Sequence, residues 1–185
     1  MNIVFQYWQL GILHVFPTGL DHMLFITALF FLSSKFKTAL IQCSVFTLAH
    51  SITLFLAVLG YLRFNSKWIE IIIALSIFIV AVENLILQQI NWHRLLLIFL
   101  FGLIHGLGFA TALSQQPIVQ SILLKALFGF NLGVETAQAG IIVFCYFLFA
   151  RGFSHKVWYQ KKLVQPISLT IACIALFWTV QRFLA

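Results

Sequence analysis

Six long runs of apolar residues, separated by short polar segments, divide this chain almost from end to end. They fall at about residues 17–34, 38–61, 68–90, 95–113, 122–150 and 163–184. Each run approaches the roughly 20 residues that an α-helix needs to cross the hydrocarbon core of a bilayer. The runs are continuous, without the alternation of apolar and polar residues that is typical of membrane β-barrel strands. The pattern therefore predicts six spanning helices.

A shorter apolar stretch precedes these runs. Residues 3–16 are too few for a typical span, and they end directly before Pro17. Proline has no backbone N–H and disrupts a helix that continues through it, so we expect a short interfacial or half-inserted helix here. The predicted fold class is all-α, a polytopic membrane helix bundle. Residues 1–185 should form a single integral membrane domain.

Composition supports this prediction and excludes a soluble domain. Hydrophobic residues make up 62% of the chain and charged residues 8%, which leaves too few polar side chains to cover a soluble surface. The first 34 residues contain no Lys or Arg, and no small-residue cleavage site follows the first apolar run. We therefore expect no cleaved signal, and insertion through the chain's own helices.

The basic residues predict the orientation of the bundle. Seven fall between the first and second, third and fourth, and fifth and sixth runs: Lys35, Lys37, Arg94, Arg151, Lys156, Lys161 and Lys162. Four fall on the other side: Arg63, Lys67, Lys125 and Arg182. Because Lys and Arg gather in cytoplasmic loops, the first set is predicted to be cytoplasmic, in a bacterial-type inner or plasma membrane. The net charge of +7 then reflects topology, and a nucleic-acid partner is not expected, since no basic stripe or RNA-binding motif is present.

Ionisable and amide side chains inside the runs are predicted to cluster at one depth. Helix directions and a rise of about 1.5 Å per residue place them in the same half of the bilayer. They are Asp21, His22, His50, His105, Asn131, Glu135 and Gln138. Ionisable residues are costly and rare in membrane spans and are usually functional. Glu83 lies towards the opposite side, where it would suit a proton relay at an inner exit.

Imidazole and carboxylate groups at one depth form a ligand set for a divalent transition metal such as nickel, cobalt or zinc. The predicted metal ligands are Asp21, His22, His50, His105 and Glu135. His14 joins them if the chain folds back at Pro17. Ser51, Asn131 and Gln138 are placed to orient those ligands. Hydrogen bonds between helices, which His, Ser, Asn and Gln commonly form in membranes, are the alternative explanation.

Glycines and the other histidines complete the pattern. Gly102 and Gly106 flank His105 and predict close approach of another helix at that point. The run at 122–150 is long and carries Gly129 and Gly133, so its helix is expected to be either strongly tilted or interrupted. His93 and His155 lie in charged loops and are predicted to be solvated, without a role in the site.

Four ordered blocks of sequence carry a resemblance that covers nearly the whole chain. They are Gly19–Phe25, with the core Gly-Leu-Asp-His, Phe46–Leu54, Phe101–Ala110 and Phe130–Glu135. In these blocks the chain resembles the HupE/UreJ family of hydrogenase and urease accessory membrane proteins, particularly its second branch. The resemblance implies a nickel or cobalt permease whose polar pathway contains Asp21, His22, His50, His105 and Glu135. The family usually has a His four residues before the Gly, whereas His14 is five before Gly19, which leaves His14 open as a ligand.

Three classes of function follow from the same residues. The leading hypothesis is the permease, which binds a divalent metal at a site reachable alternately from both sides. The rival is a membrane-embedded zinc hydrolase or transferase, with three histidines holding the metal and Glu135 acting as general base. Such an enzyme should retain its metal through purification. A third class is a non-catalytic subunit of another membrane protein. The sequence also leaves open whether the chain forms a homo-oligomer.

Overall fold

The structure is a computed structural model that describes residues 2–62, 65–86, 92–114 and 122–185. Within these ranges all regular elements are helical. In chain order they are α1 (Ile3–Val15), α2 (Leu20–Ser33), α3 (Phe36–Val58), α4 (Ser66–Ile86), α5 (Trp92–Ser114), α6 (Leu123–Cys145), two π-helical turns (Tyr146–Ala150 and Gln160–Val164) and α7 (Gln165–Leu184). Arg63 and residues 87–90, at the end of the third apolar run, lie outside the described residues.

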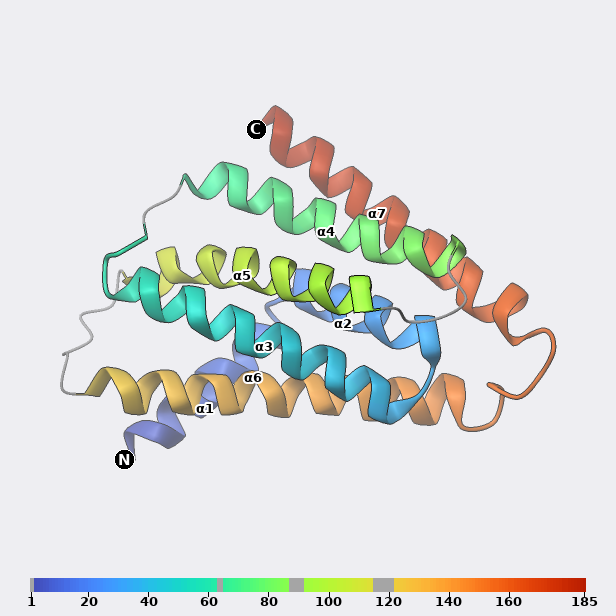
Figure 1. Ribbon diagram of the computed structural model, residues 1–185, viewed down its shortest axis with the longest axis horizontal. Coiled ribbons are helices and arrows are strands. Elements are labelled where there is room, and N and C mark those ends of the chain that lie inside the picture. Colours follow the sequence, from blue (N-terminus) through green and yellow to red (C-terminus); the bar gives the residue numbers. More distant parts are fainter. Residues whose placement is uncertain (1, 63–64, 87–91, 115–121) are drawn as a thin grey trace.

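The helices pack side by side as a bundle (Figure 1). Five segments are long and apolar enough to cross a membrane: Phe36–Val58, Ser66–Ile86, Trp92–Phe109, Leu123–Ala150 and Gln160–Leu184. The all-α polytopic bundle is therefore confirmed. The sixth span differs in detail, because α2 has only 14 residues. It reaches spanning length only together with α1, and the two are bent by 73°.

The bend between α1 and α2 has a local cause. Helix α1 ends at Val15, shortly before Pro17, whose ring cannot continue the backbone hydrogen bonds of the helix. The chain then folds back so tightly at Gly19 that an added methyl group would overlap the carbonyl oxygen of His14. Helix α2 starts directly after this glycine. Thus His14 lies beside the first turn of α2.

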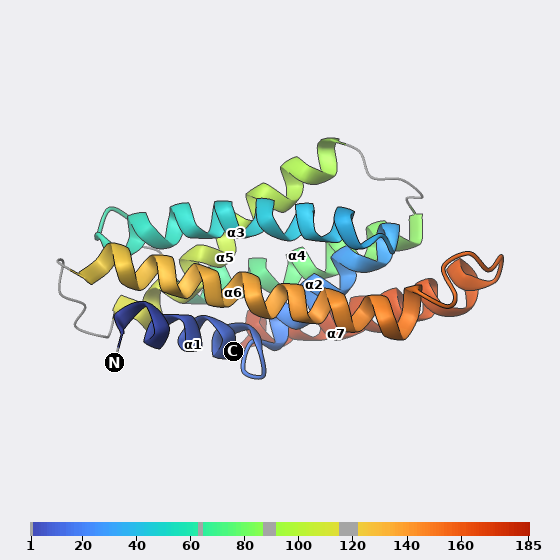
Figure 2. The same ribbon diagram turned by 90° about the horizontal axis from the view of Figure 1, so that it is seen from below.

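Glycines hold α1 against α6 (Figure 2). A methyl group added at Gly133 would overlap the carbonyl oxygen of Trp8, and one added at Gly129 would overlap that of Val4. Gly11 approaches the backbone of Phe130 in the same way. Helix α6 itself runs without a break from Leu123 to Cys145. The predicted alternative of an interruption at these glycines is therefore wrong, because they provide room for α1. The broken span is the first one.

A second glycine interface joins α3 and α5, which confirms the predicted close approach of another helix at His105. Gly102 lies against the backbone of Phe46, and Gly106 lies against the carbonyl oxygen of His50 and the hydroxyl of Thr53. The Thr53 hydroxyl also donates to the carbonyl oxygen of Leu103 at 2.7 Å. These close approaches fix the height of α3 relative to α5. They therefore also fix the depth of the polar side chains on the two helices.

The helices run in alternating directions, which gives the bundle two distinct ends. Helices α2 and α4 begin, and α7 finishes, at the end that holds Asp21. Helix α5 begins, and α4 finishes, at the end that holds Arg94. We name these the Asp21 end and the Arg94 end. The charge pattern predicts that the Asp21 end is external.

Candidate metal site

Four histidines from four helices lie together between α1, α2, α3 and α5. They are His14, His22, His50 and His105, here called the histidine cluster. The ring centroid of His22 lies 4.5 Å from that of His14, 6.1 Å from that of His50 and 5.2 Å from that of His105. His22, His50 and His105 are at most 6% exposed, and His14 is partly buried. The bend at Pro17 brings His14 into this group.

Aromatic rings form the walls of the histidine cluster. Phe109 and Phe130 contact His14, with ring centroids 4.1 and 5.4 Å away. Phe25 and Phe46 contact His105 at 5.2 and 5.0 Å. Such walls pack closely and contribute no hydrogen-bonding groups of their own to the imidazoles. The histidine nitrogens therefore depend on one another, on other polar side chains or on a ligand.

Most of these nitrogens have no hydrogen-bond partner among the residues that the structure describes. The unpartnered atoms are Nε2 of His14, Nε2 of His22, both ring nitrogens of His50 and Nδ1 of His105. The other nitrogen of His105, Nε2, lies 3.0 Å from the Ser76 hydroxyl. An unsatisfied buried polar atom costs about 1–3 kcal/mol, so five of them in one place mark a position where a bound ion or water molecules would supply the missing partners. Imidazole nitrogens suit nickel, cobalt and zinc.

The present ring orientations do not form a completed metal centre. In the described ranges, no group of three or more His, Cys, Asp or Glu side chains is arranged so that it could hold a metal ion. The rings meet largely edge to face, with interplanar angles of 79° and 88° for His22 against His50 and His105. Rotation about χ2, a soft torsion in histidine, redirects a ring nitrogen without moving the helix. The four imidazoles have the chemistry of transition-metal ligands, whereas their arrangement in this structure is not that of a metal site.

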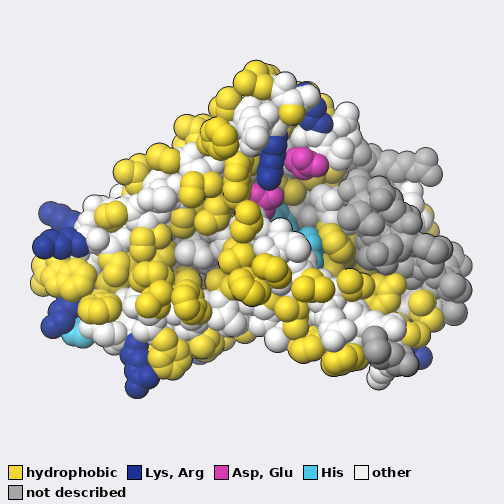
Figure 3. Space-filling view, turned by 180° about the vertical axis from the view of Figure 1, so that it is seen from behind, with side chains coloured by type: hydrophobic (Ala, Val, Ile, Leu, Met, Phe, Trp, Pro, Cys, Tyr) yellow, Lys and Arg dark blue, Asp and Glu magenta, His cyan; other side chains and the backbone are white. Residues whose placement is uncertain are grey.

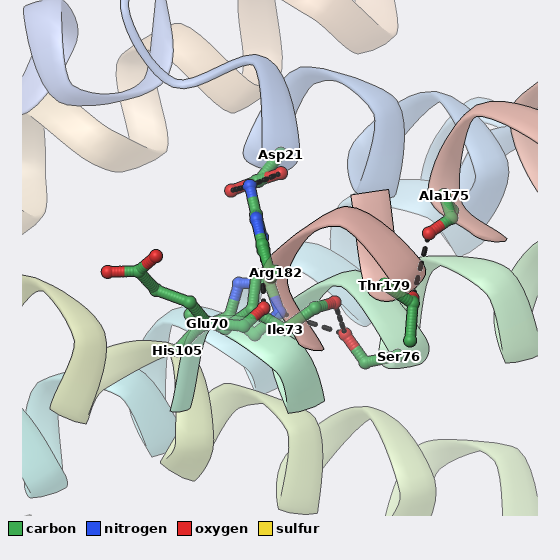
Figure 4. Close-up of polar contacts among 8 residues, drawn as sticks. All are labelled: Asp21, Glu70, Ile73, Ser76, His105, Ala175, Thr179 and Arg182. Carbon is green, nitrogen blue, oxygen red and sulfur yellow. Dashed lines mark hydrogen bonds and ion pairs between the residues drawn. The ribbon is translucent and has the colours of Figure 1, made fainter. Parts of the chain in front are cut away.

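Asp21 lies at the mouth of this site but binds an arginine. Its two carboxylate oxygens accept hydrogen bonds from Nη2 of Arg182, at 3.0 and 2.9 Å (Figure 4). Nη1 of Arg182 donates to the backbone carbonyl of Glu70 at 2.9 Å. The predicted metal ligand Asp21 is therefore engaged by α7, while its neighbour His22 points into the cluster.

Glu83 lies apart from the cluster, as predicted, and is also paired with an arginine. Its carboxylate contacts Nη1 of Arg94 at 2.6 Å. Arg94 is 2% exposed and donates further hydrogen bonds to Gln42 and Asn84. The prediction that Arg94 is a loop charge is therefore wrong, because this guanidinium is buried where three helices meet. A relay role for Glu83 stays a prediction and requires this pair to open.

Glu135 does not join the histidines. It is exposed and lines a pocket of about 410 Å³ on the surface between α3 and α6, together with Ser51 and Asn131. Gln138 is buried and accepts a hydrogen bond from the Thr47 hydroxyl at 3.0 Å. The structure thus separates these residues into a second polar region beside the cluster. Their predicted roles toward a metal stay untested predictions.

Sequence reasoning missed three residues that shape the site. Arg182 and Arg94 were counted only as topology signals, although each binds a carboxylate. Ser76 contacts His105 from α4. The arginines could have been found from the sequence, because a carboxylate inside the membrane needs a partner and few basic residues lie at its depth. A lone serine in an apolar helix carries no comparable signal.

Comparison with known proteins identifies the family. A family model described as HupE / UreJ protein matches residues 1–182, so the chain belongs to the HupE/UreJ family. This membership implies an accessory membrane protein associated with nickel or cobalt. No curated protein and no solved structure matches the chain.

Proposed function

We propose that this member of the HupE/UreJ family is a secondary permease for nickel or cobalt, and that the histidine cluster is where the ion binds. The observation that carries the proposal is the set of buried ring nitrogens without partners, contributed by four different helices. A set of purely structural histidines would be expected to hydrogen-bond its nitrogens across the helix interfaces. A divalent transition ion supplies the missing partner.

Transport requires that the ion exchange its water shell for the cluster and then leave again. A hydrated ion enters at the Asp21 end, where the acidic side chain attracts it, and the imidazoles replace water molecules as their rings turn. Only neutral imidazoles bind, so protonation of the histidines releases the ion.

The ion leaves through the Arg94 end. In this scheme Glu83 is the acidic group on that route, and its pair with Arg94 opens before the ion passes. Glu135 and Asn131 form a second polar region that opens sideways between α3 and α6. In this scheme that region supports the cluster from outside and does not coordinate the ion in the state described.

Proteoliposomes containing the purified protein test the proposal. External nickel or cobalt should reach a metal-sensitive dye in the lumen. His22→Ala, His50→Ala and His105→Ala should each lower the initial rate by at least about tenfold, since even residues that only support metal ligands are worth 10–100-fold. The matched control is His155→Ala, an exposed histidine outside the spanning helices.

The controls separate loss of transport from loss of protein. Equal amounts of folded protein in each vesicle preparation are required, measured by recovery after solubilisation. Asp21→Asn should lower the rate with the same yield, because the entrance loses the carboxylate next to His22. Equal rates for wild type and for all three cluster variants would remove the cluster from the pathway. Binding in detergent without entry into the lumen would leave a metal-binding protein and refute the permease.

A further inference from the structure

We infer that Arg182 is the gate of the site at the Asp21 end. Its guanidinium binds the Asp21 carboxylate, which lies on the path of an entering cation. The guanidinium must move away before an ion reaches the histidines. This inference rests on the proposed function for the identity of the ion. The gate itself controls access to the histidine cluster, and this access can be measured without any metal.

The contacts of Arg182 connect three helices across the entrance. The side chain comes from the last turns of α7, binds both oxygens of Asp21 at the start of α2, and donates to the backbone of Glu70 at the start of α4. Its guanidinium carbon lies 5.6 Å from the ring centroid of Trp178, one turn earlier on α7. One side chain therefore ties together the helix ends that surround the opening.

The histidines lie directly behind this tie. Asp21 precedes His22, whose ring is 5.2 Å from that of His105. His105 in turn contacts Ser76, on the same helix as Glu70. Figure 3 shows basic and acidic side chains together over a hollow in the surface, with histidine side chains visible in it. Opening this tie would increase the access of solvent at the Asp21 end to His22 and His105, which are 6% and 1% exposed in this structure.

The positive charge of Arg182 explains how this residue controls access to the histidine cluster. The guanidinium of Arg182 is bound to the carboxylate that would otherwise attract a cation. An incoming divalent ion must therefore compete with Arg182 for Asp21. The pair is only partly shielded, with 24% of the Arg182 side chain and 26% of the Asp21 side chain exposed. Exposed pairs of this kind are weak and exchange readily, as a gate requires.

The test measures access to the histidines in the intact purified protein. Diethyl pyrocarbonate, which acylates neutral imidazole, is added from an ethanol stock, and mass spectrometry follows the modification of His22 and His105 with time. Arg182→Gln should be modified about two- to fivefold faster than wild type, the change in an opening equilibrium that loss of an exposed ion pair produces. Arg182→Lys keeps the charge but has one nitrogen where arginine uses two, so it cannot bind Asp21 and the Glu70 carbonyl through separate nitrogens, and it should fall between them.

Matched controls isolate the gate. Lys67→Gln removes an exposed cation from the start of α4, at the same end, and should leave the modification rates unchanged. His155, exposed outside the spanning helices, should react equally fast in every variant and reports on reagent activity. If Arg182→Gln is recovered in poor yield, wild-type protein at rising salt replaces it, since screening weakens the exposed pair and should speed modification.

The outcomes distinguish the gate from the proposed function. Equal modification of wild type and Arg182→Gln, or of wild type at low and high salt, would overturn the gate. Nickel ions added to wild type form a separate arm, in which slower modification of His22 and His105 supports binding at the cluster. Faster modification in Arg182→Gln without any protection by nickel would keep the gate and refute the proposed function.

Discussion

The two arginine–carboxylate pairs at opposite ends of the bundle differ in how firmly they are held. At the Arg94 end, the arginine side chain is 1% exposed and donates to Glu83, Gln42 and Asn84. Asn84 continues the network to the backbone of Ala28 at 2.7 Å. At the Asp21 end, Arg182 is 24% exposed and has one carboxylate and one backbone carbonyl as partners.

This difference assigns different roles to two similar contacts. A buried arginine gives up its partners only at a high cost, because each group left behind would be an unpaired polar atom in a low-dielectric interior. The Arg94 pair is therefore a structural clamp in the state described. A partly exposed arginine can exchange its carboxylate for water at small cost. We therefore expect the Asp21 end, which lies next to the histidine cluster, to open more readily than the Arg94 end.

The largest expected effect on stability comes from a substitution that breaks the Arg94 clamp. Arg94→Met removes the charge and leaves Glu83, Gln42 and Asn84 without their donor. Breaking a buried pair from one side costs about 3–5 kcal/mol, so the free energy of unfolding should fall by that amount. Denaturant unfolding of the protein in detergent measures it. A loss no larger than that of the same substitution at Arg182 would erase the distinction between the two ends.

A smaller effect is expected from the glycine contact that holds α1 at the site. Gly133→Ala places a methyl group against the Trp8 carbonyl and forces α1 away from α6. Overpacking of this kind costs about 1–3 kcal/mol of unfolding free energy. Gly140→Ala, on the same helix with nothing within 4 Å of the added atom, is the control and should be neutral or stabilising. Equal stabilities of the two variants would show that the α1–α6 contact is not tight.

Arg182→Met should have a still smaller effect on stability. The pair that it removes is partly exposed, so the cost should be at most about 1 kcal/mol, while access to the histidines increases. Unfolding and histidine modification are measured on the same preparation. A loss comparable with that of Arg94→Met would make Arg182 a clamp as well and exclude a gate at this position.

The smallest effect is a difference in salt sensitivity. At about 1 M salt the screening length falls to roughly 3 Å, and exposed pairs lose most of their attraction. The stability difference between wild type and Arg182→Met should therefore disappear at high salt, whereas that between wild type and Arg94→Met should persist. Unfolding curves at low and high sodium chloride measure both differences. If both disappeared, the Arg94 pair would be accessible to solvent ions.

The sequence predicted the membrane bundle and the depth of the histidines, because both follow from the spacing of apolar and polar residues. The rise per residue of an α-helix and the direction of each helix were enough to place His22, His50 and His105 at one depth. The same reasoning placed Glu83 elsewhere. The glycines around His105 correctly indicated a close helix contact, since small residues have few other uses in an apolar helix.

Pairing of side chains was harder to predict, because it depends on which helices are neighbours. The contact of Arg182 with Asp21 joins residues 161 positions apart, across α2 and α7. Likewise, the glycines of α6 signalled a close approach without identifying α1 as the partner. A count of basic residues could not separate a buried arginine from a loop charge. Depth alone also could not show that Glu135 faces away from the histidines.

Cobalt(II) bound to the purified protein tests the central claim most directly, because its visible absorption spectrum reports the ligands of the ion. Wild type and His155→Ala should give the same spectrum of a histidine-coordinated cobalt site. His22→Ala and His105→Ala should lose that spectrum while retaining the unfolding behaviour of the folded protein. Identical cobalt spectra in all four proteins, or no bound cobalt in any of them, would contradict a metal site at the histidine cluster.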